Sequence, residues 1–283
     1  MASLGTYLSF VRVSHTVFAL PFAITGALLA TRTTPPSWGR FGWILVCMVA
    51  ARSAAMGFNR LVDARFDAAN PRTKNRELPR GAMTLREGAA FVAVWAVVFV
   101  AASFQLSALC GWLSPVALAI VFWYSLAKRF THYTQAFLGL AMAVAPVGGW
   151  LAAGGRGGWA PWVLGAAIGL WVAGFDIIYA CQDVAVDRAQ GLKSIPVRFG
   201  VAGALRLSRV LHVAAVAVMA TLALVVPLGP IYLMGVAIVA GLLAYEQSLV
   251  SASDLSRAAQ AFDLNGYVGI LYMTITAVSL YVR

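Results

Sequence analysis

The chain has 283 residues, of which 61% are hydrophobic and only 11% are charged, and its mean hydropathy is +0.82. A water-soluble domain usually carries about 25% charged residues, so this composition excludes an ordinary soluble protein. The formal net charge of +11 does not require a nucleic-acid partner, because membrane orientation, anionic lipid or an anionic substrate explains it more simply.

Apolar runs recur along the whole chain, and most are near or above the roughly 18 residues that cross the hydrocarbon of a bilayer. Backbone groups inside a bilayer must be satisfied within helices, so we predict an all-α integral membrane protein. No soluble domain or low-complexity tail interrupts the pattern, which indicates one transmembrane domain over residues 1–283. In chain order, the nine predicted spans are residues 12–31, 41–62, 87–106, 109–127, 135–153, 160–182, 207–226, 231–250 and 266–282.

The basic residues divide unequally between the two sides that alternating spans would create. The three longest connections, 63–86, 183–206 and 251–265, fall on one side, which also holds sixteen of the 21 Lys and Arg residues. Because basic loops stay in the cytoplasm, we expect the long connections and the N-terminus to be cytoplasmic. No acidic residue falls in an outer loop, so the cytoplasmic face is expected to be the working face.

The first of two carboxylate-rich segments, NRLVDARFD (59–67), stands at the end of the second span. Asn59, Asp63 and Asp67 are four residues apart, which places them on one face of a helix. The two aspartates are then about 6 Å apart along the helix axis. Carboxylates are costly beside a bilayer, so this arrangement needs a reason.

The second segment, DIIYACQDVAVD (176–187), follows the sixth span, and its spacing of i, i+3, i+7 and i+11 predicts one helical face for Asp176, Tyr179, Asp183 and Asp187. Two carboxylates a turn apart repel each other unless a cation lies between them. Mg²⁺ prefers oxygen ligands and binds through one or two carboxylates plus substrate phosphates. Two such pairs facing each other would hold a diphosphate through magnesium. The alternative is helix ends whose acids are solvated or paired with nearby arginines.

Basic segments follow these acidic faces. They are NPRTKNRELPRG (70–81), KRFTHYTQ (128–135) and DRAQGLKSIPVRFG (187–200). Arginine binds phosphate through forked hydrogen bonds and lysine binds it as a point charge, so both suit a polyanion bridged by metal. Lipid headgroups and membrane topology explain some of these basic residues equally well.

At this point the chain resembles the intramembrane aromatic prenyltransferases of the UbiA superfamily. Their signature is N-x-x-x-D-x-x-x-D with a second D-x-x-x-D preceded by tyrosine, and it matches both acidic segments. RVSHTVFALPFA, RTKNRELPRG, YSLAKRFTHYTQAFLGLA and GLKSIPVRFG extend the resemblance over about the first 200 residues, whereas the last three spans match only in hydropathy. The chain is most similar to the 4-hydroxybenzoate polyprenyltransferase branch, which includes relatives from menaquinone synthesis.

The resemblance implies nine transmembrane helices around a central cavity that cytoplasmic loops cap. It implies Mg²⁺-dependent transfer of a polyprenyl group from a polyprenyl diphosphate to an aromatic acid in quinone biosynthesis. The acid would be 4-hydroxybenzoate or a dihydroxynaphthoate-type ring. It also implies a bacterial inner (plasma) membrane as the location, with the active-site loops in the cytoplasm and no nucleic-acid partner.

Residue by residue, the resemblance assigns three roles. Tyr179 would stand beside the leaving diphosphate. The diphosphate-binding set would be Arg72, Arg76, Lys128, Arg129 and Lys193. The metal-binding set would be Asn59, Asp63, Asp67, Asp183 and Asp187.

Arg52 lies one heptad before Asn59 on the same predicted face, at a depth where a charge needs an explanation. It could hold the carboxylate of an aromatic acceptor, or it could pair with Asp176. Asp176 and Arg12 are further candidates for the acceptor site.

Two other functions remain open. A superfamily member could use a non-aromatic acceptor or cyclise the terpenoid, and diphosphate would then be released with no ring added. A secondary transporter could also carry intramembrane charge, but its charges would gather near the midplane rather than at one face.

Overall fold

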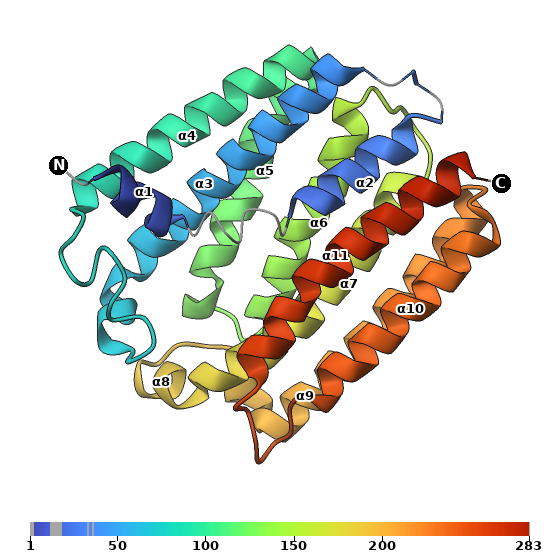
Figure 1. The fold of residues 1–283 in the computed structure, drawn as a ribbon. Coiled ribbons are helices and arrows are strands. Elements are labelled where there is room, and N and C mark those ends of the chain that lie inside the picture. The colour runs from blue at the N-terminus through green and yellow to red at the C-terminus, as the bar shows by residue number, and fades with distance from the viewer. Residues whose placement is uncertain (1–2, 12–18, 33, 36, 283) are drawn as a thin grey trace. The chain divides into compact units, whose positions relative to one another are not determined.

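The computed structural model describes residues 3–11, 19–32, 34–35 and 37–282, and all regular structure in that part of the chain is helical (Figure 1). Short 3₁₀ turns cover Ala127–Arg129 and Cys181–Asp183. The α-helices are α1 (Leu4–Phe10), α2 (Leu20–Ala30), α3 (Trp38–Ala69), α4 (Leu85–Leu106), α5 (Ala108–Leu126), α6 (Thr134–Ala152), α7 (Ala160–Ala180), α8 (Val184–Ala189), α9 (Ile195–Val225), α10 (Gly229–Ser248) and α11 (Ala258–Tyr281). The predicted all-α class is confirmed.

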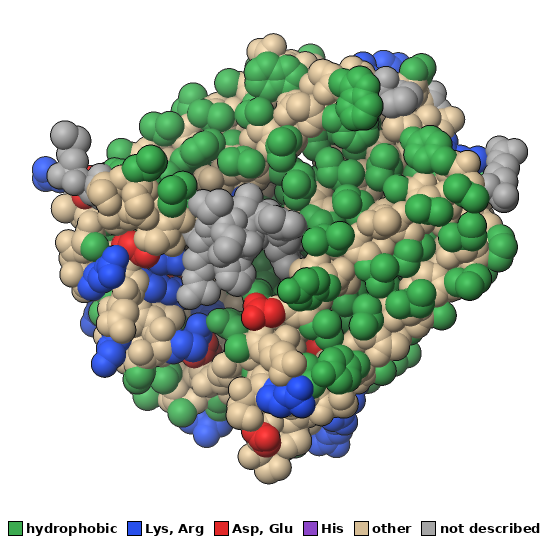
Figure 2. Space-filling model, viewed as in Figure 1, with side chains coloured by type: hydrophobic (Ala, Val, Ile, Leu, Met, Phe, Trp, Pro, Cys, Tyr) green, Lys and Arg blue, Asp and Glu red, His purple; other side chains and the backbone are tan. Residues whose placement is uncertain are grey.

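Eight helices in the described residues are long and apolar enough to cross a bilayer, so the protein is an integral membrane protein. Hydrophobic side chains are exposed over much of the surface seen in Figure 2, as a lipid-facing surface requires. The first predicted span, 12–31, is represented by α2 from Leu20 onward, and α2 is an apolar helix too short to count as a span by itself. Residues 12–18 lie outside the described residues, so a total of nine spans stays a prediction.

The helices form two compact units, and the first contains α1, α3, α4 and α5. α3 has 32 residues and is therefore about 48 Å long, which exceeds the roughly 30 Å of hydrocarbon that it must cross. It packs closely on α4, because a Cβ at Gly57 would lie 2.8 Å from the Val92 side chain. α4 begins with a capping box, in which Thr84 and Glu87 exchange side-chain and backbone hydrogen bonds.

The second unit contains α2 and all helices from α6 to α11, with α7 against α6, α9 and α11. The backbones of α2 and α6 touch at two places. A Cβ at Gly26 would lie 2.0 Å from the Pro146 carbonyl oxygen, and a Cβ at Gly149 would lie 2.0 Å from the Ala23 carbonyl oxygen. Glycine is required at both positions, because small residues are what allow transmembrane helices to approach so closely.

Three helix boundaries differ from the prediction, and each helix is longer than its apolar run. α3 continues to Ala69 rather than residue 62, and α9 begins at Ile195 rather than residue 207, with a break at Gly200 where φ is 69°. α11 begins at Ala258 rather than residue 266. Hydropathy marks the part of a helix that lies in hydrocarbon, whereas polar turns continue these helices beyond it. The predicted connection 183–206 is mostly helical, with α8 and the first turns of α9 lying within it.

Candidate active site

The first carboxylate segment lies on the last turns of α3, and its predicted helical spacing is confirmed. Asn59 and Asp63 are half-buried, and Asn59 Nδ2 donates a hydrogen bond to Asp63 Oδ2 over 3.2 Å. The amide thus orients the carboxylate one turn later on the same face. Asp67 is buried, with 7% of its surface exposed.

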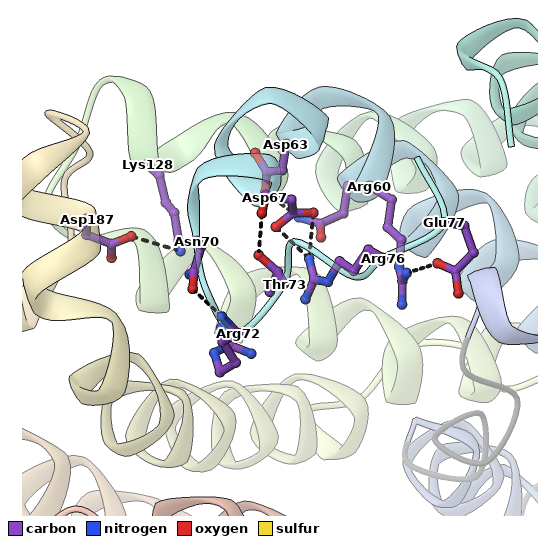
Figure 3. A network of polar contacts seen from close by, with 11 residues as sticks. Arg60, Asp63, Asp67, Asn70, Arg72, Thr73, Arg76, Glu77, Lys128 and Asp187 are labelled. Carbon is purple, nitrogen blue, oxygen red and sulfur yellow. Dashed lines mark hydrogen bonds and ion pairs between the residues drawn. The ribbon is translucent and has the colours of Figure 1, made fainter. Parts of the chain in front are cut away.

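The turns after α3 fold back onto its acidic end (Figure 3). Arg76 Nη1 donates to both carboxylate oxygens of Asp67, at 2.9 and 2.8 Å. The Thr73 hydroxyl donates to the Asp67 backbone carbonyl over 3.1 Å, which anchors the start of the turns. For Asp67, pairing with a nearby arginine is therefore observed, and Arg76 stands where it could bind either a carboxylate or a phosphate.

A buried ion pair holds the same turns from the other side. Arg60 and Glu77 are both buried and form a salt bridge between their side chains. The Ser9 hydroxyl of α1 donates to the second Glu77 oxygen over 2.8 Å, and the Arg60 guanidinium lies 5.7 Å from the Phe10 ring centroid. Removing one partner of a buried pair leaves the other charge uncompensated, so this cluster fixes the turns that carry Arg76.

The second carboxylate segment is not one continuous α-helix. α7 ends at Ala180, the 3₁₀ turn contains Asp183, and α8 contains Asp187. The prediction of a single regular helical face for all four residues is therefore wrong. Gln182 Nε2 donates to the Tyr179 carbonyl oxygen over 3.2 Å and satisfies a carbonyl at the helix end, which favours the tightened turn. Asp183 and Asp187 are both buried.

Lys128 stands beside this segment. Its Nζ atom lies 3.7 Å from Asp187 Oδ1, while Asp187 Oδ2 is buried with no hydrogen-bond partner in the described part of the chain. Lys193 fixes the lysine's backbone, because the Lys193 N–H donates to the Lys128 carbonyl over 2.8 Å. Lys128, Asp183 and Asp187 are all close enough for their charges to act on Asp176. The structure thus brings these predicted residues together within one unit.

The remaining predicted residues have less defined surroundings. Arg72 is exposed, and its backbone N–H donates to the Asn70 side chain over 2.9 Å. Arg129 is half-buried in the 3₁₀ turn after α5. Arg52 is half-buried in the middle of α3, near Tyr124 of α5. Arg12 lies outside the described residues.

The carboxylates fit magnesium held jointly with a phosphate better than a metal held by protein alone. No group of three or more His, Cys, Asp or Glu side chains that could enclose a metal occurs among the described residues. Mg²⁺ normally takes one or two carboxylates and completes its shell with water and substrate phosphate oxygens. The buried, unpartnered Asp187 Oδ2 and the Asp63 carboxylate oriented by Asn59 are donors of that kind.

Two residues near these segments have no role in the sequence prediction. Glu77 is the only acid in a basic stretch, and that isolation is the signal that could have identified it. Phe262 of α11 lies against Tyr179, with ring centroids 4.7 Å apart. No local signal could have identified Phe262, because it follows Tyr179 by more than eighty residues and one more Phe in an apolar span is unremarkable.

Comparison with known proteins gives consistent matches. The sequence pattern described as "UbiA prenyltransferase family" matches residues 19–273. The 4-hydroxybenzoate octaprenyltransferase of Cupriavidus necator is 32% identical over 250 residues, which cover 88% of this chain and 87% of that protein. The apo structure of a UbiA homolog from Aeropyrum pernix K1 is 36% identical, with a TM-score of 0.86 over 95% of this chain and 99% of that one. A UbiA homolog from Archaeoglobus fulgidus bound to GPP and Mg²⁺ shares the fold, at 19% identity and a TM-score of 0.74 over 98% of this chain and 100% of that one.

Proposed function

The chain belongs to the UbiA prenyltransferase family, and from that premise we propose that it transfers a polyprenyl group from a polyprenyl diphosphate to an aromatic acid. The acceptor is 4-hydroxybenzoate or a dihydroxynaphthoate-type acid, and the reaction requires Mg²⁺. The relatives named 4-hydroxybenzoate octaprenyltransferases support the first of these acceptors. The protein works in a plasma membrane, the inner membrane of a bacterium, with its N-terminus and its acidic segments on the cytoplasmic side.

One observation carries the proposal: each carboxylate segment has a cationic side chain fixed beside it. Arg76 contacts Asp67 and Lys128 lies near Asp187, so each segment offers both oxygen ligands for a metal and a positive charge for phosphate. We assign Asn59, Asp63, Asp67, Asp183 and Asp187 to metal binding. Arg72, Arg76, Lys128, Arg129 and Lys193 are assigned to the diphosphate.

The reaction begins when the allylic C–O bond breaks and its electron pair leaves with the diphosphate. Mg²⁺, when bound, supplies positive charge that stabilises this leaving group. Arg76 and Lys128 neutralise further charge as it develops on the phosphate oxygens. A ring carbon of the acceptor then gives an electron pair to the allylic cation and forms the new C–C bond. The ring loses a proton and regains its aromaticity.

The allylic cation must also be kept from water, and the apolar helices supply that environment. Tyr179 is half-buried near the end of α7, in the turn after Asp176. We place its ring beside the leaving diphosphate, where its face stabilises developing positive charge on the allylic carbon.

Purified protein tests the proposal directly. With geranyl diphosphate, Mg²⁺ and 4-hydroxybenzoate, we expect release of diphosphate and a product whose mass equals the acid plus one geranyl group minus one proton. Two parallel incubations contain a dihydroxynaphthoate-type acid as acceptor, or no acceptor. Diphosphate release with only hydrocarbon or alcohol products would assign the chain to terpenoid cyclisation or hydrolysis instead. Absence of any turnover with all three would overturn the proposal.

We expect Arg52→Ala to raise the KM for the aromatic acid about tenfold while the KM for the prenyl diphosphate changes little. A guanidinium contributes about 1–2 kcal/mol when it binds a carboxylate through charged hydrogen bonds, and its loss affects only the acceptor. Steady-state kinetics with each substrate varied in turn measures the effect. Arg40→Ala, on the same helix, is the matched control. An unchanged acceptor KM in Arg52→Ala would remove Arg52 from the acceptor site.

A further inference from the structure

The last turns of α7 have one face that is not fully buried. Every residue from Trp171 to Ala180 is buried except Asp176 and Tyr179, which are half-buried. These two residues are three apart and therefore lie on the same face of the helix. In the proposed function this face of α7 is turned toward the substrate. A residue that contacts the Tyr179 ring therefore lies at the edge of the substrate site.

Phe262 of α11 is that neighbour. Its ring centroid lies 4.7 Å from that of Tyr179, with 42° between the ring planes, and 5.6 Å from that of Phe175 in an edge-on arrangement. Phe175 is buried, whereas Phe262 is half-buried like Tyr179. Aromatic pairs at these distances attract each other beyond their buried area, so Phe262 limits the rotation of the tyrosine ring.

A set of buried hydrogen bonds fixes the position of α11 along α7, and so keeps Phe262 level with Tyr179. Asn265, one turn after Phe262, is completely buried and accepts a hydrogen bond from Trp171 Nε1 over 2.7 Å. Its Nδ2 atom donates to Glu246 Oε1 of α10 over 3.0 Å, so one side chain connects α7, α10 and α11. A shift of α11 by one turn would leave these buried groups without partners, at a cost of about 1–3 kcal/mol for each group.

We propose that Phe262 is a positioning residue that holds the Tyr179 ring toward the reacting allylic carbon. The inference rests on the proposed function and extends it to α11, a helix that carries none of the predicted site residues. With the ring held, the cation forms beside a fixed aromatic face and combines with the acceptor carbon, which loses its proton. With the ring loose, water reaches the cation, forms a C–O bond and loses a proton, and the product is the prenyl alcohol.

The experiment compares Phe262→Leu with the wild-type full-length chain, using geranyl diphosphate, Mg²⁺ and 4-hydroxybenzoate. We expect kcat to fall about tenfold and the KM for geranyl diphosphate to stay within about twofold, because a fixed ring acts on the transition state rather than on substrate binding. The ratio of geraniol to prenylated acid should rise about fivefold or more, as expected of a site that excludes water less well. Phe262→Tyr, which keeps the ring, should restore wild-type values.

Two further variants separate positioning from packing. Tyr267→Leu, at a residue of α11 that is 72% exposed, is the matched control and should behave as wild type. Phe262→Met, of similar volume but without a ring, should show the same loss as Phe262→Leu. It also replaces that variant if Phe262→Leu proves unstable in thermal unfolding. Wild-type kinetics and product ratio in a folded ring-less variant would overturn the inference.

A double-mutant cycle gives the decisive readout. If Phe262 acts through Tyr179, removing Phe262 should have little further effect once Tyr179 is absent. The kcat of the double variant Tyr179→Leu/Phe262→Leu should then lie within about twofold of the kcat of Tyr179→Leu. Losses that multiply would show that Phe262 acts only through general packing, and would overturn the inference. Failure of the proposed function is distinguishable, because the wild-type protein would then make no prenylated acid at all.

Discussion

Replacing Asp183 with alanine is expected to lower kcat by about a thousandfold or more, and Asp63→Ala should have a similar effect. In the proposed function, each substitution removes an oxygen ligand of the metal that binds the diphosphate. Asp183 is buried, and the Asp63 carboxylate is oriented by a hydrogen bond from Asn59, so each side chain is held in place before any ligand binds. Diphosphate release from geranyl diphosphate by the purified variants measures the effect.

The matched control is Asp254→Ala, because Asp254 is an exposed acid in the connection between α10 and α11. That variant should keep wild-type turnover. Thermal unfolding of Asp63→Ala and Asp183→Ala should show folded protein, since the helices that carry them are fixed by other contacts. Wild-type kcat in either aspartate variant would exclude that residue from metal binding.

Removing divalent metal with excess EDTA is expected to lower turnover to about 1% or less, and added Mg²⁺ should restore it. The described residues contain no group of three or more His, Cys, Asp or Glu side chains placed to hold a metal, so the metal should bind tightly only together with diphosphate. Calorimetry should therefore show weak binding of Mg²⁺ alone and stronger binding when a non-reactive diphosphate is present.

The chelated protein should remain folded, because Asp67 and Asp187 already have Arg76 and Lys128 as cationic partners without metal. A thermal unfolding curve that does not change on addition of EDTA would agree with this expectation. Full turnover in excess EDTA would contradict the metal requirement, and tight binding of Mg²⁺ alone would contradict the shared site.

The sequence predicts the long helices and the first acidic face well, because both depend on local spacing. Apolar runs mark the membrane-crossing parts, and the four-residue interval of Asn59, Asp63 and Asp67 survives because α3 is regular over that stretch. The resemblance to a known family adds the class of reaction. The resemblance includes both acidic segments, because each matches a short motif that can be read directly from the sequence.

Features that depend on tertiary contacts could not be predicted in the same way. The 3₁₀ turn at Cys181–Asp183 is accompanied by a hydrogen bond from the Gln182 side chain, which hydrophobic periodicity does not reveal. The start of α11 at Ala258 follows from buried residues at helical spacing, Ala258, Ala261 and Asn265, of which one is polar. The contact between Tyr179 and Phe262 joins distant segments, so only a structure could reveal it.

The touching backbones of α2 and α6 leave no space between these helices for an isoprenoid such as the proposed substrate carries. Each isoprene unit carries a methyl branch, and at Gly26 and Gly149 the seam has no room for a single added carbon. These two helices therefore behave as one wall during substrate entry. If the proposed substrate enters from the bilayer, its isoprenoid tail should therefore pass between other helices.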